Sequence, residues 1–333
     1  MLWVLLLACD KGGDDTDGGT TPDDSTPVDD SSSDDSGTEK PPVLTGACAN
    51  GTRVGFIEIS HTSHDDALVT AQVEDSVYPT SKLTLVEEKN GCKMMRKENP
   101  FCDPTCKSGY TCDLDGECVP YPLRVSAGTI EVTGTVADYS MEGGDSNYYW
   151  DGSAELPLFK PGAVITGTAT GSAKLSAFEL HGYGVEQVEL PKGQSWDSEP
   201  PPTWTLQEDT PFEFNWIPSK EEEGDMYITL AIDQHGATPA TLFCEVDDSG
   251  SLTVPASMVN ELIVRGVSGF PAAYVYRRTM DHVETELGCV EMEVSVQHEP
   301  FLTVVGHTPC ASSDDCPKGQ TCDLPTQTCV DKK

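Results

Sequence analysis

Short stretches in which apolar and polar residues alternate run through most of this chain, and this period of two predicts β-strands. The alternation is clearest at residues 212–216, 228–232 and 290–296, while residues 130–136 carry β-branched side chains on both faces. Glycine and proline interrupt these runs at short intervals. A helical pattern is suggested at residues 256–262. The chain is therefore predicted to be mainly β, built of antiparallel β-sandwich domains.

Two cysteine clusters repeat one motif, C-x-x-G-x-T-C-D-L, which begins at Cys106 and again at Cys316. Each cluster is too short to build a hydrophobic core, so disulfides must stabilise it, by about 3 kcal/mol for a loop near 15 residues. The repeat predicts four folded parts: a small β-domain (43–100), a cysteine-rich module (101–120), a β-sandwich (121–306) and a second cysteine-rich module (307–333).

The thirteen cysteines are typical of a protein from an oxidising compartment. If Cys9 carries a lipid, as its sequence context described below suggests, the other twelve cysteines can close six disulfides. Four cysteines allow three pairings in each module, and we expect the first to join the third and the second to join the fourth. The isolated cysteines are expected to tie two strands of one domain. The expected pairs are Cys48–Cys92, Cys102–Cys112, Cys106–Cys118, Cys244–Cys289, Cys310–Cys322 and Cys316–Cys329. Zinc is disfavoured because the cysteine spacings of the modules depart from the usual zinc spacing, and because an exported protein tends to oxidise such thiols.

Residues 1–8, MLWVLLLA, form a short apolar run that ends at a small residue directly before Cys9, as a signal peptide and its cleavage site would. Residues 6–9 resemble a bacterial lipobox, which implies that the Cys9 thiol is lipidated. The alternative is an ordinary signal peptide in which Cys9 is not modified. The match to a lipoprotein signal also lacks the usual positively charged n-region. Residues 9–42 are nearly devoid of apolar side chains and are predicted to be a disordered acidic tether.

The strongly negative charge of the chain restricts the classes of partner that it can bind. The 56 acidic and 20 basic residues give a formal net charge of −36, which repels phosphate backbones and excludes nucleic acid as an expected partner. No run of about 18 apolar residues occurs, so we expect contact with a membrane only through the N-terminal lipid anchor. No nucleotide-binding loop and no G-x-S-x-G motif is found, so neither a cofactor nor a catalytic residue is predicted.

Potential metal ligands and general bases cluster at His61, His64, Asp65 and Asp66. Their spacing departs from the H-E-x-x-H pattern, in which two histidines one helical turn apart hold zinc. The cluster also follows a predicted strand directly. A solvated loop is therefore the favoured interpretation, and no metal site is predicted.

Aromatic residues in Gly-, Ser- and Pro-rich stretches are the candidate ligand platform, because exposed rings can stack on sugar faces. The candidates are Tyr148, Tyr149, Trp150, Trp196 and Trp204. The alternative, which large aromatic side chains favour, is that these rings cap the ends of the sandwich. The Arg277-Arg278 pair could meet an acidic partner, but internal salt bridges are favoured in so acidic a chain.

The whole chain resembles a group of uncharacterised cysteine-rich lipoproteins from myxobacteria and related deltaproteobacteria. The resemblance rests on the lipobox, the acidic spacer, and residues 100–122, 218–233 and 247–256. It implies export and lipidation but no known activity. The cysteine modules are also similar in spacing to Dickkopf and EGF-like modules, a likeness that implies nothing about function.

These observations favour a non-enzymatic, lipid-anchored protein of the cell envelope, on the periplasmic or the outer side, that presents a β-sandwich for binding or adhesion to a protein or glycan. The alternatives are a secreted hydrolase without a recognisable motif and a purely structural envelope component. A hydrolase predicts a deep pocket with converging polar groups near His61 or His64. A binding protein predicts an exposed aromatic or apolar patch.

Overall fold

The computed structural model describes residues 41–62, 66–98, 102–221, 224–233, 240–266, 270–324 and 327–332. The expected signal peptide, Cys9 and nearly all of the expected tether lie outside these ranges. In the part that is described, the fold is mainly β with several sheets and a single α-helix, which confirms the expected fold class. None of the described helices has the length and apolar character to cross a membrane.

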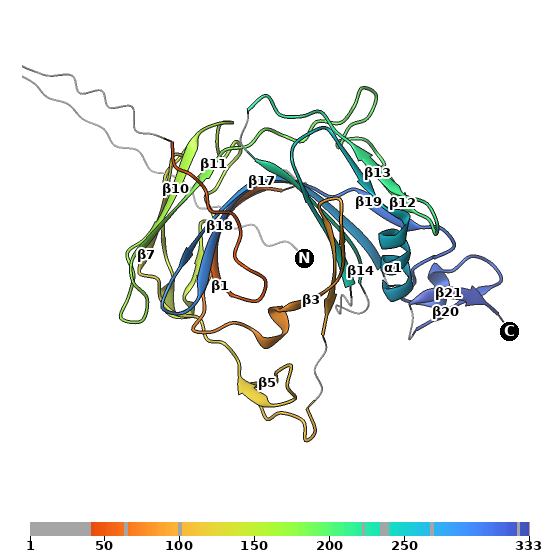
Figure 1. The fold of residues 1–333 in the computed structure, drawn as a ribbon, viewed down its shortest axis with the longest axis horizontal. Helices are drawn as coiled ribbons and strands as arrows, with labels where there is room; N and C mark the ends of the chain where they lie inside the picture. The colour runs from red at the N-terminus through yellow and green to blue at the C-terminus, as the bar shows by residue number, and fades with distance from the viewer. Residues whose placement is uncertain are drawn as a thin grey trace, which may run out of the picture. The chain divides into compact units, whose positions relative to one another are not determined.

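A nine-stranded sheet forms the centre of the fold (Figure 1). Its strands, in their spatial order, are β3 (Leu83–Lys89), β4 (Cys92–Lys97), β15 (Ala240–Val246), β14 (Asp225–Asp233), β17 (Phe270–Glu284), β18 (Cys289–His298), β1 (Arg53–His61), β2 (Ala67–Val73) and β9 (Tyr148–Trp150). Figure 1 shows this sheet curved into an arch. The convex face of this arch is called here the outer face, and the concave face is called the inner face.

One pair in this sheet departs from the expected antiparallel arrangement, because β1 and β18 run parallel. Parallel neighbours cannot be joined by a tight hairpin and need a long connection. Here nearly the whole folded chain lies between the two strands, so the pairing is a contact between its beginning and its end. Alternation within one strand carries no information about such a distant partner.

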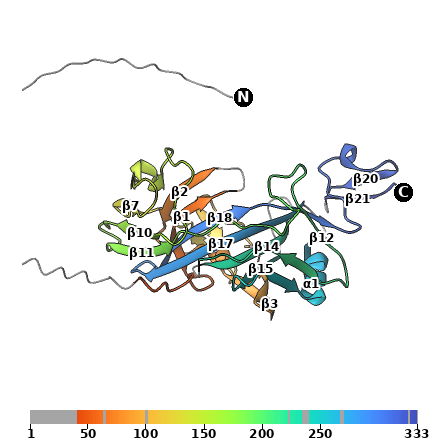
Figure 2. The same ribbon diagram turned by 90° about the horizontal axis from the view of Figure 1, so that it is seen from above.

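A four-stranded sheet packs on the outer face at one end of the arch (Figures 1 and 2). Buried side chains from both sheets form one hydrophobic core, which includes Ile57, Ile130 and Met292. The sheets approach closely at Gly182, where an added Cβ would lie 2.6 Å from a Val294 methyl carbon, so only glycine fits. The strands of this sheet, in order, are β11 (Phe178–Tyr183), β10 (Val164–Ala169), β7 (Thr129–Thr133) and β8 (Tyr139–Glu142).

A second core covers the outer face at the other end of the arch. The α-helix buries Met258, Val259, Leu262 and Ile263, which lie on one helical face and confirm the helical pattern of the sequence. The covering elements are α1 (Ala256–Gly266), the parallel pair β12 (Thr203–Leu206) and β19 (Phe301–Val304), and the antiparallel pair β13 (Phe212–Asn215) and β16 (Ser251–Val254).

The boundary expected near residue 100 does not separate two β-domains. Strands β1 to β4 come from the expected small domain, yet β1 pairs with β18 and β4 pairs with β15, both from the expected sandwich. Residues 41–333 accordingly form one compact unit. The error arose because strands close in sequence were assumed to share a sheet, whereas backbone hydrogen bonds here join strands far apart in the chain.

The two cysteine-rich modules are small disulfide-linked hairpins. The first contains β5 (Tyr110–Cys112) and β6 (Cys118–Pro120), and the second contains β20 (Gln320–Asp323) and β21 (Thr328–Asp331). Their bridges join Cys102 to Cys112, Cys106 to Cys118, Cys310 to Cys322 and Cys316 to Cys329, the order expected from the repeat. Three short 3-10 helices complete the described elements: Pro79–Ser81, Gly144–Ser146 and Ser313–Asp315.

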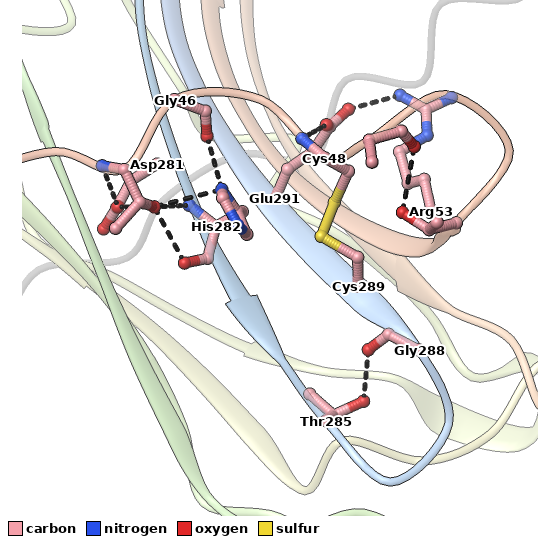
Figure 3. Close-up of a disulfide and its surroundings, with 12 residues drawn as sticks. Gly46, Cys48, Arg53, Asp281, His282, Thr285, Gly288, Cys289 and Glu291 are labelled. Carbon is pink, nitrogen blue, oxygen red and sulfur yellow. Dashed lines mark hydrogen bonds and ion pairs between the residues drawn. A yellow bond between two sulfur atoms is a disulfide. The ribbon is translucent and has the colours of Figure 1, made fainter.

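The two remaining disulfides correct the expected pairing. Cys48 is bonded to Cys289, and Cys92 to Cys244, in place of the pairs Cys48–Cys92 and Cys244–Cys289. Cys92 and Cys244 are direct neighbours on β4 and β15, and Cys48 precedes β1 and reaches the first residue of β18 (Figure 3). Both bridges therefore follow the sheet order and not the sequence order. Six disulfides indicate an oxidising, extracytoplasmic location.

Candidate functional site

A cleft of about 920 Å³ opens where several strand ends meet. It is lined by the last residue of β1, His61, by the last residue of β18, His298, and by the first residues of β19. The long connection between β11 and β12 supplies the facing wall, which includes Trp196. The volume lies within the range of about 300–1,000 Å³ that is common for small-ligand sites.

The indole of Trp196 is held in place in the wall of the cleft. Its Nε1 donates a 2.6 Å hydrogen bond to the carbonyl of Val188. Its ring stacks on the imidazole of His298, with centroids 4.5 Å apart and planes within 6° of parallel. The half-buried indole and imidazole together present a preorganised aromatic surface.

Among the described residues that line the cleft there is no lysine or arginine. Its carboxylates belong to Glu189, Asp197 and Glu299, all exposed, and its amides to Gln187 and Gln194. Carboxylates accept hydrogen bonds, and amides both accept and donate them. This lining disfavours an anionic ligand, and its acceptors and donors can bond the hydroxyl groups of a polyhydroxylated one.

Two of the sequence candidates, His61 and Trp196, therefore line the same cleft. His61 Nδ1 is hydrogen-bonded to the side-chain amide of Gln187. Of the other metal candidates, His64 and Asp65 lie outside the described residues and Asp66 is exposed. In the ranges that the structure covers, no set of three converging metal ligands includes His61 or Asp66.

The aromatic cluster on β9 divides into structural and exposed members. Tyr149 is fully buried, and its hydroxyl accepts a 2.7 Å hydrogen bond from the backbone N–H of Ala127, so it belongs to the core. Tyr148 and Trp150 are 39% and 63% exposed on the opposite side of this edge strand. The ligand-platform prediction therefore fails for Tyr149, because alternate residues of a strand point to opposite faces.

Trp204 is half-buried and packs on the second core. Its ring lies 5.0 Å from that of Phe212 and 4.7 Å from that of Phe214, centroid to centroid. It does not line the cleft. This placement matches the alternative in which aromatic rings cap the sandwich.

Arginines 277 and 278 both form internal ion pairs, as favoured from the sequence. On the outer face, Arg277 Nε lies 3.0 Å from an Asp248 oxygen. On the inner face, Arg278 lies 3.1 Å from Glu293 and 3.2 Å from Glu245. These two neighbouring residues of one strand thus form ion pairs on opposite faces of the sheet.

Another cavity, of about 210 Å³, lies on the inner face. The sequence alone did not predict it. Phe56 and Glu58 of β1 meet Tyr227 of β14 and Tyr276 of β17 there. The only sequence signal was the alternation of β1, in which Phe56 and Glu58 interleave with the core residues Ile57 and Ile59. Which strands would face Phe56 could not be read without the sheet order.

The chain matches no protein-family model, and no curated protein matches it in sequence. The class that its fold defines is that of mainly β, disulfide-linked, extracytoplasmic proteins.

Proposed function

We propose that this protein is a non-enzymatic, lipid-anchored binding protein of the cell envelope, and that its cleft holds a neutral glycan. The aromatic surface of Trp196 and His298 carries the proposal. The C–H face of a pyranose ring packs on such a surface by dispersion and burial of apolar area. The carboxylates and amides around the surface would then bond the hydroxyl groups of the sugar.

Replacing Trp196 with alanine tests the site. Trp196→Ala should weaken glycan binding roughly thirtyfold or more, because large aromatic side chains at the centre of binding sites contribute about 2 kcal/mol or more. A glycan array with the full chain would find the ligand, and titration calorimetry would measure both variants. Trp204→Ala is the matched control, since it also truncates a half-buried tryptophan but lies outside the cleft.

The proposal would be rejected if Trp196→Ala bound as tightly as the unaltered chain, or if Trp204→Ala lost binding equally. Release of free sugar from the bound glycan would instead favour the hydrolase alternative. The residues to replace in that case are His61 and Glu299, which also line the cleft.

The lipid anchor is tested separately. The acyl chains proposed at Cys9 would hold the chain on a membrane stably, because two chains bind far more strongly than one. Cells grown with a labelled fatty acid should yield labelled protein, and Cys9→Ala should abolish the label and release the chain into the soluble fraction. An unlabelled mature protein would show that Cys9 is not acylated.

A further inference from the structure

The inner-face cavity contains a carboxylate, that of Glu58, for which the described structure shows no ion pair. Glu291 is paired with Arg53 at 2.7 Å and Glu293 with Arg278 at 3.1 Å. The hydrogen bond found for the Glu58 carboxylate comes from the hydroxyl of Ser60, at 3.1 Å. Among the described residues that line the cavity, three carboxylates accompany two arginines, and Glu58 is the carboxylate without an ion pair.

The surroundings of Glu58 disfavour its charge. Glu58 lies directly opposite Glu293 on the neighbouring strand β18. Burial, and after it the negative charge of Glu293, raise the pKa of the Glu58 carboxyl, and they outweigh the Ser60 hydrogen bond and the charge of Arg53, which lower it. Burial and the charge of Glu293 also raise the pKa of the Tyr276 hydroxyl. Like charges opposite one another in a sheet destabilise it, so a cation placed between them would be bound favourably.

The aromatic walls of the cavity already attract cations from the protein. The guanidinium carbon of Arg278 lies 3.5 Å from the centroid of the Tyr227 ring, and that of Arg53 lies 5.9 Å from the centroid of Phe56. Tyr276 is a ring neighbour of Tyr227 at 5.8 Å, and no cation from the described part of the chain lies over it. An ammonium group beside Tyr276 would gain a cation–π contact as well as the Glu58 carboxylate.

A second feature of the cavity wall is a buried donor that lacks an acceptor. The side chain of Arg278 lines the cavity, the residue is only 9% exposed, and its Nε finds no hydrogen-bond partner in the described structure. A buried donor without an acceptor costs free energy. An oxygen close to the amine of a ligand, such as a peptide carbonyl, would satisfy it after a small shift of the side chain.

The geometry suits an organic cation better than a metal ion. The sets of three ligand groups that lie within 4.8 Å of one another are found in the two cysteine modules and at His282, Glu284 and Cys289, for the residues described. The carboxylates of the cavity are not among them, whereas calcium takes six to eight oxygens at short range.

We propose that the cavity between Glu58 and Tyr276 binds an alkylammonium group, supplied by a lysine side chain of a peptide or by a free amine. The carboxylates of Glu58 and Glu293 would hold the ammonium, and the rings of Phe56 and Tyr276 would enclose its methylene groups. This site lies on the inner face of the sheet and does not depend on the glycan cleft.

Calorimetry on the full chain tests the proposal with four probes. They are n-butylammonium, its neutral isostere n-butanol, a capped Gly-Lys-Gly peptide, and the same peptide with norleucine in place of lysine. The amine or the lysine peptide should bind, and the neutral partners should not. A stronger response to the peptide would identify a protein side chain as the source of the ammonium, and a stronger response to n-butylammonium would identify a free amine.

Glu58→Gln should weaken this binding roughly thirtyfold, the lower range for removal of one partner from a buried charge pair. The same variant should unfold at a higher temperature than the unaltered chain without ligand, because it removes a carboxylate that the fold disfavours. A purely structural role for Glu58 predicts the opposite shift. Glu131→Gln, with the same charge change on an exposed residue of β7, should leave the affinity unchanged.

Failure of both ammonium probes to bind at millimolar concentration would overturn the proposal. So would equal binding of n-butanol, or a Glu58→Gln variant with unchanged affinity. Glycan binding by the same variants should be unaffected. Failure of the ammonium proposal would therefore leave the glycan proposal intact, and the two outcomes can be distinguished.

Discussion

Replacing Arg277 with methionine is expected to lower the free energy of unfolding by about 3–5 kcal/mol, the cost of removing one partner of a buried ion pair. Arg277 is 1% exposed. Besides its pair with Asp248, its guanidinium donates hydrogen bonds to the carbonyl oxygens of Glu186, Gln187 and Ile217. Methionine would leave the largely buried Asp248 carboxylate without its cation, although Trp216 and Ser219 still donate to it, and would leave three carbonyls without these donors. Denaturant unfolding monitored by tryptophan fluorescence measures the loss.

The matched control is Arg265→Met. Arg265 forms an ion pair with Glu261 one helical turn away, at 2.8 Å, but both side chains are substantially exposed. Such a pair contributes less than about 1 kcal/mol. Adding Asp248→Asn to Arg277→Met should recover part of the loss, because the stranded charge is removed. Equal effects of the Arg265 and Arg277 replacements would contradict this account.

Removing the Cys48–Cys289 bridge by replacing both cysteines with serine is expected to cost between about 3 and 5 kcal/mol. The bridge joins residues 241 positions apart. Because Cys92–Cys244 lies inside that loop and shortens it, the effective loop consists only of residues 48–92 and 244–289. The same replacement should therefore cost about 1 kcal/mol more when the Cys92–Cys244 bridge is also absent. Unfolding of the four variants forms a double-mutant cycle that measures this difference.

Removal of Cys316–Cys329 serves as the control, because that bridge closes a loop of 13 positions within one module. The main unfolding transition should hardly shift, since Cys316 lies in neither large core. If this local bridge mattered as much as Cys48–Cys289, loop closure would not be the source of the stability.

The features that could be predicted from the sequence are those set by local periodicity. Alternation identified the strands that contain residues 212–215, 228–232 and 290–296, because each side chain's face depends only on its position in its own strand. The helix at Ala256–Gly266 was found from its apolar face for the same reason. The module disulfides followed from a repeat whose loops close within a few residues.

The features that could not be predicted depend on the order of strands in the sheet. The pairing of β1 with β18 placed Cys48 beside Cys289, the pairing of β4 with β15 placed Cys92 beside Cys244, and both pairings joined the expected domains into one sheet. The cleft could not be predicted for the same reason, since His61 and Trp196 come from segments that are remote in sequence. The inner cavity needs β1, β14, β17 and β18 together, and no single strand indicates it.

The attachment of the N-terminal segment has a mechanical consequence. Residues 41–47 are held by reversible contacts, among them the 2.7 Å hydrogen bond from the Thr45 hydroxyl to Asp281. The next fixed point is the covalent bond from Cys48 to Cys289, at the start of a central strand (Figure 3). A force pulling on the chain before Pro41 would first break those contacts. It would then act through the disulfide on β18, in the middle of the sheet, without peeling β1 from its neighbours β18 and β2. Within the described part of the chain, tension would extend only residues 41–47, and the binding surfaces would keep their shape under load.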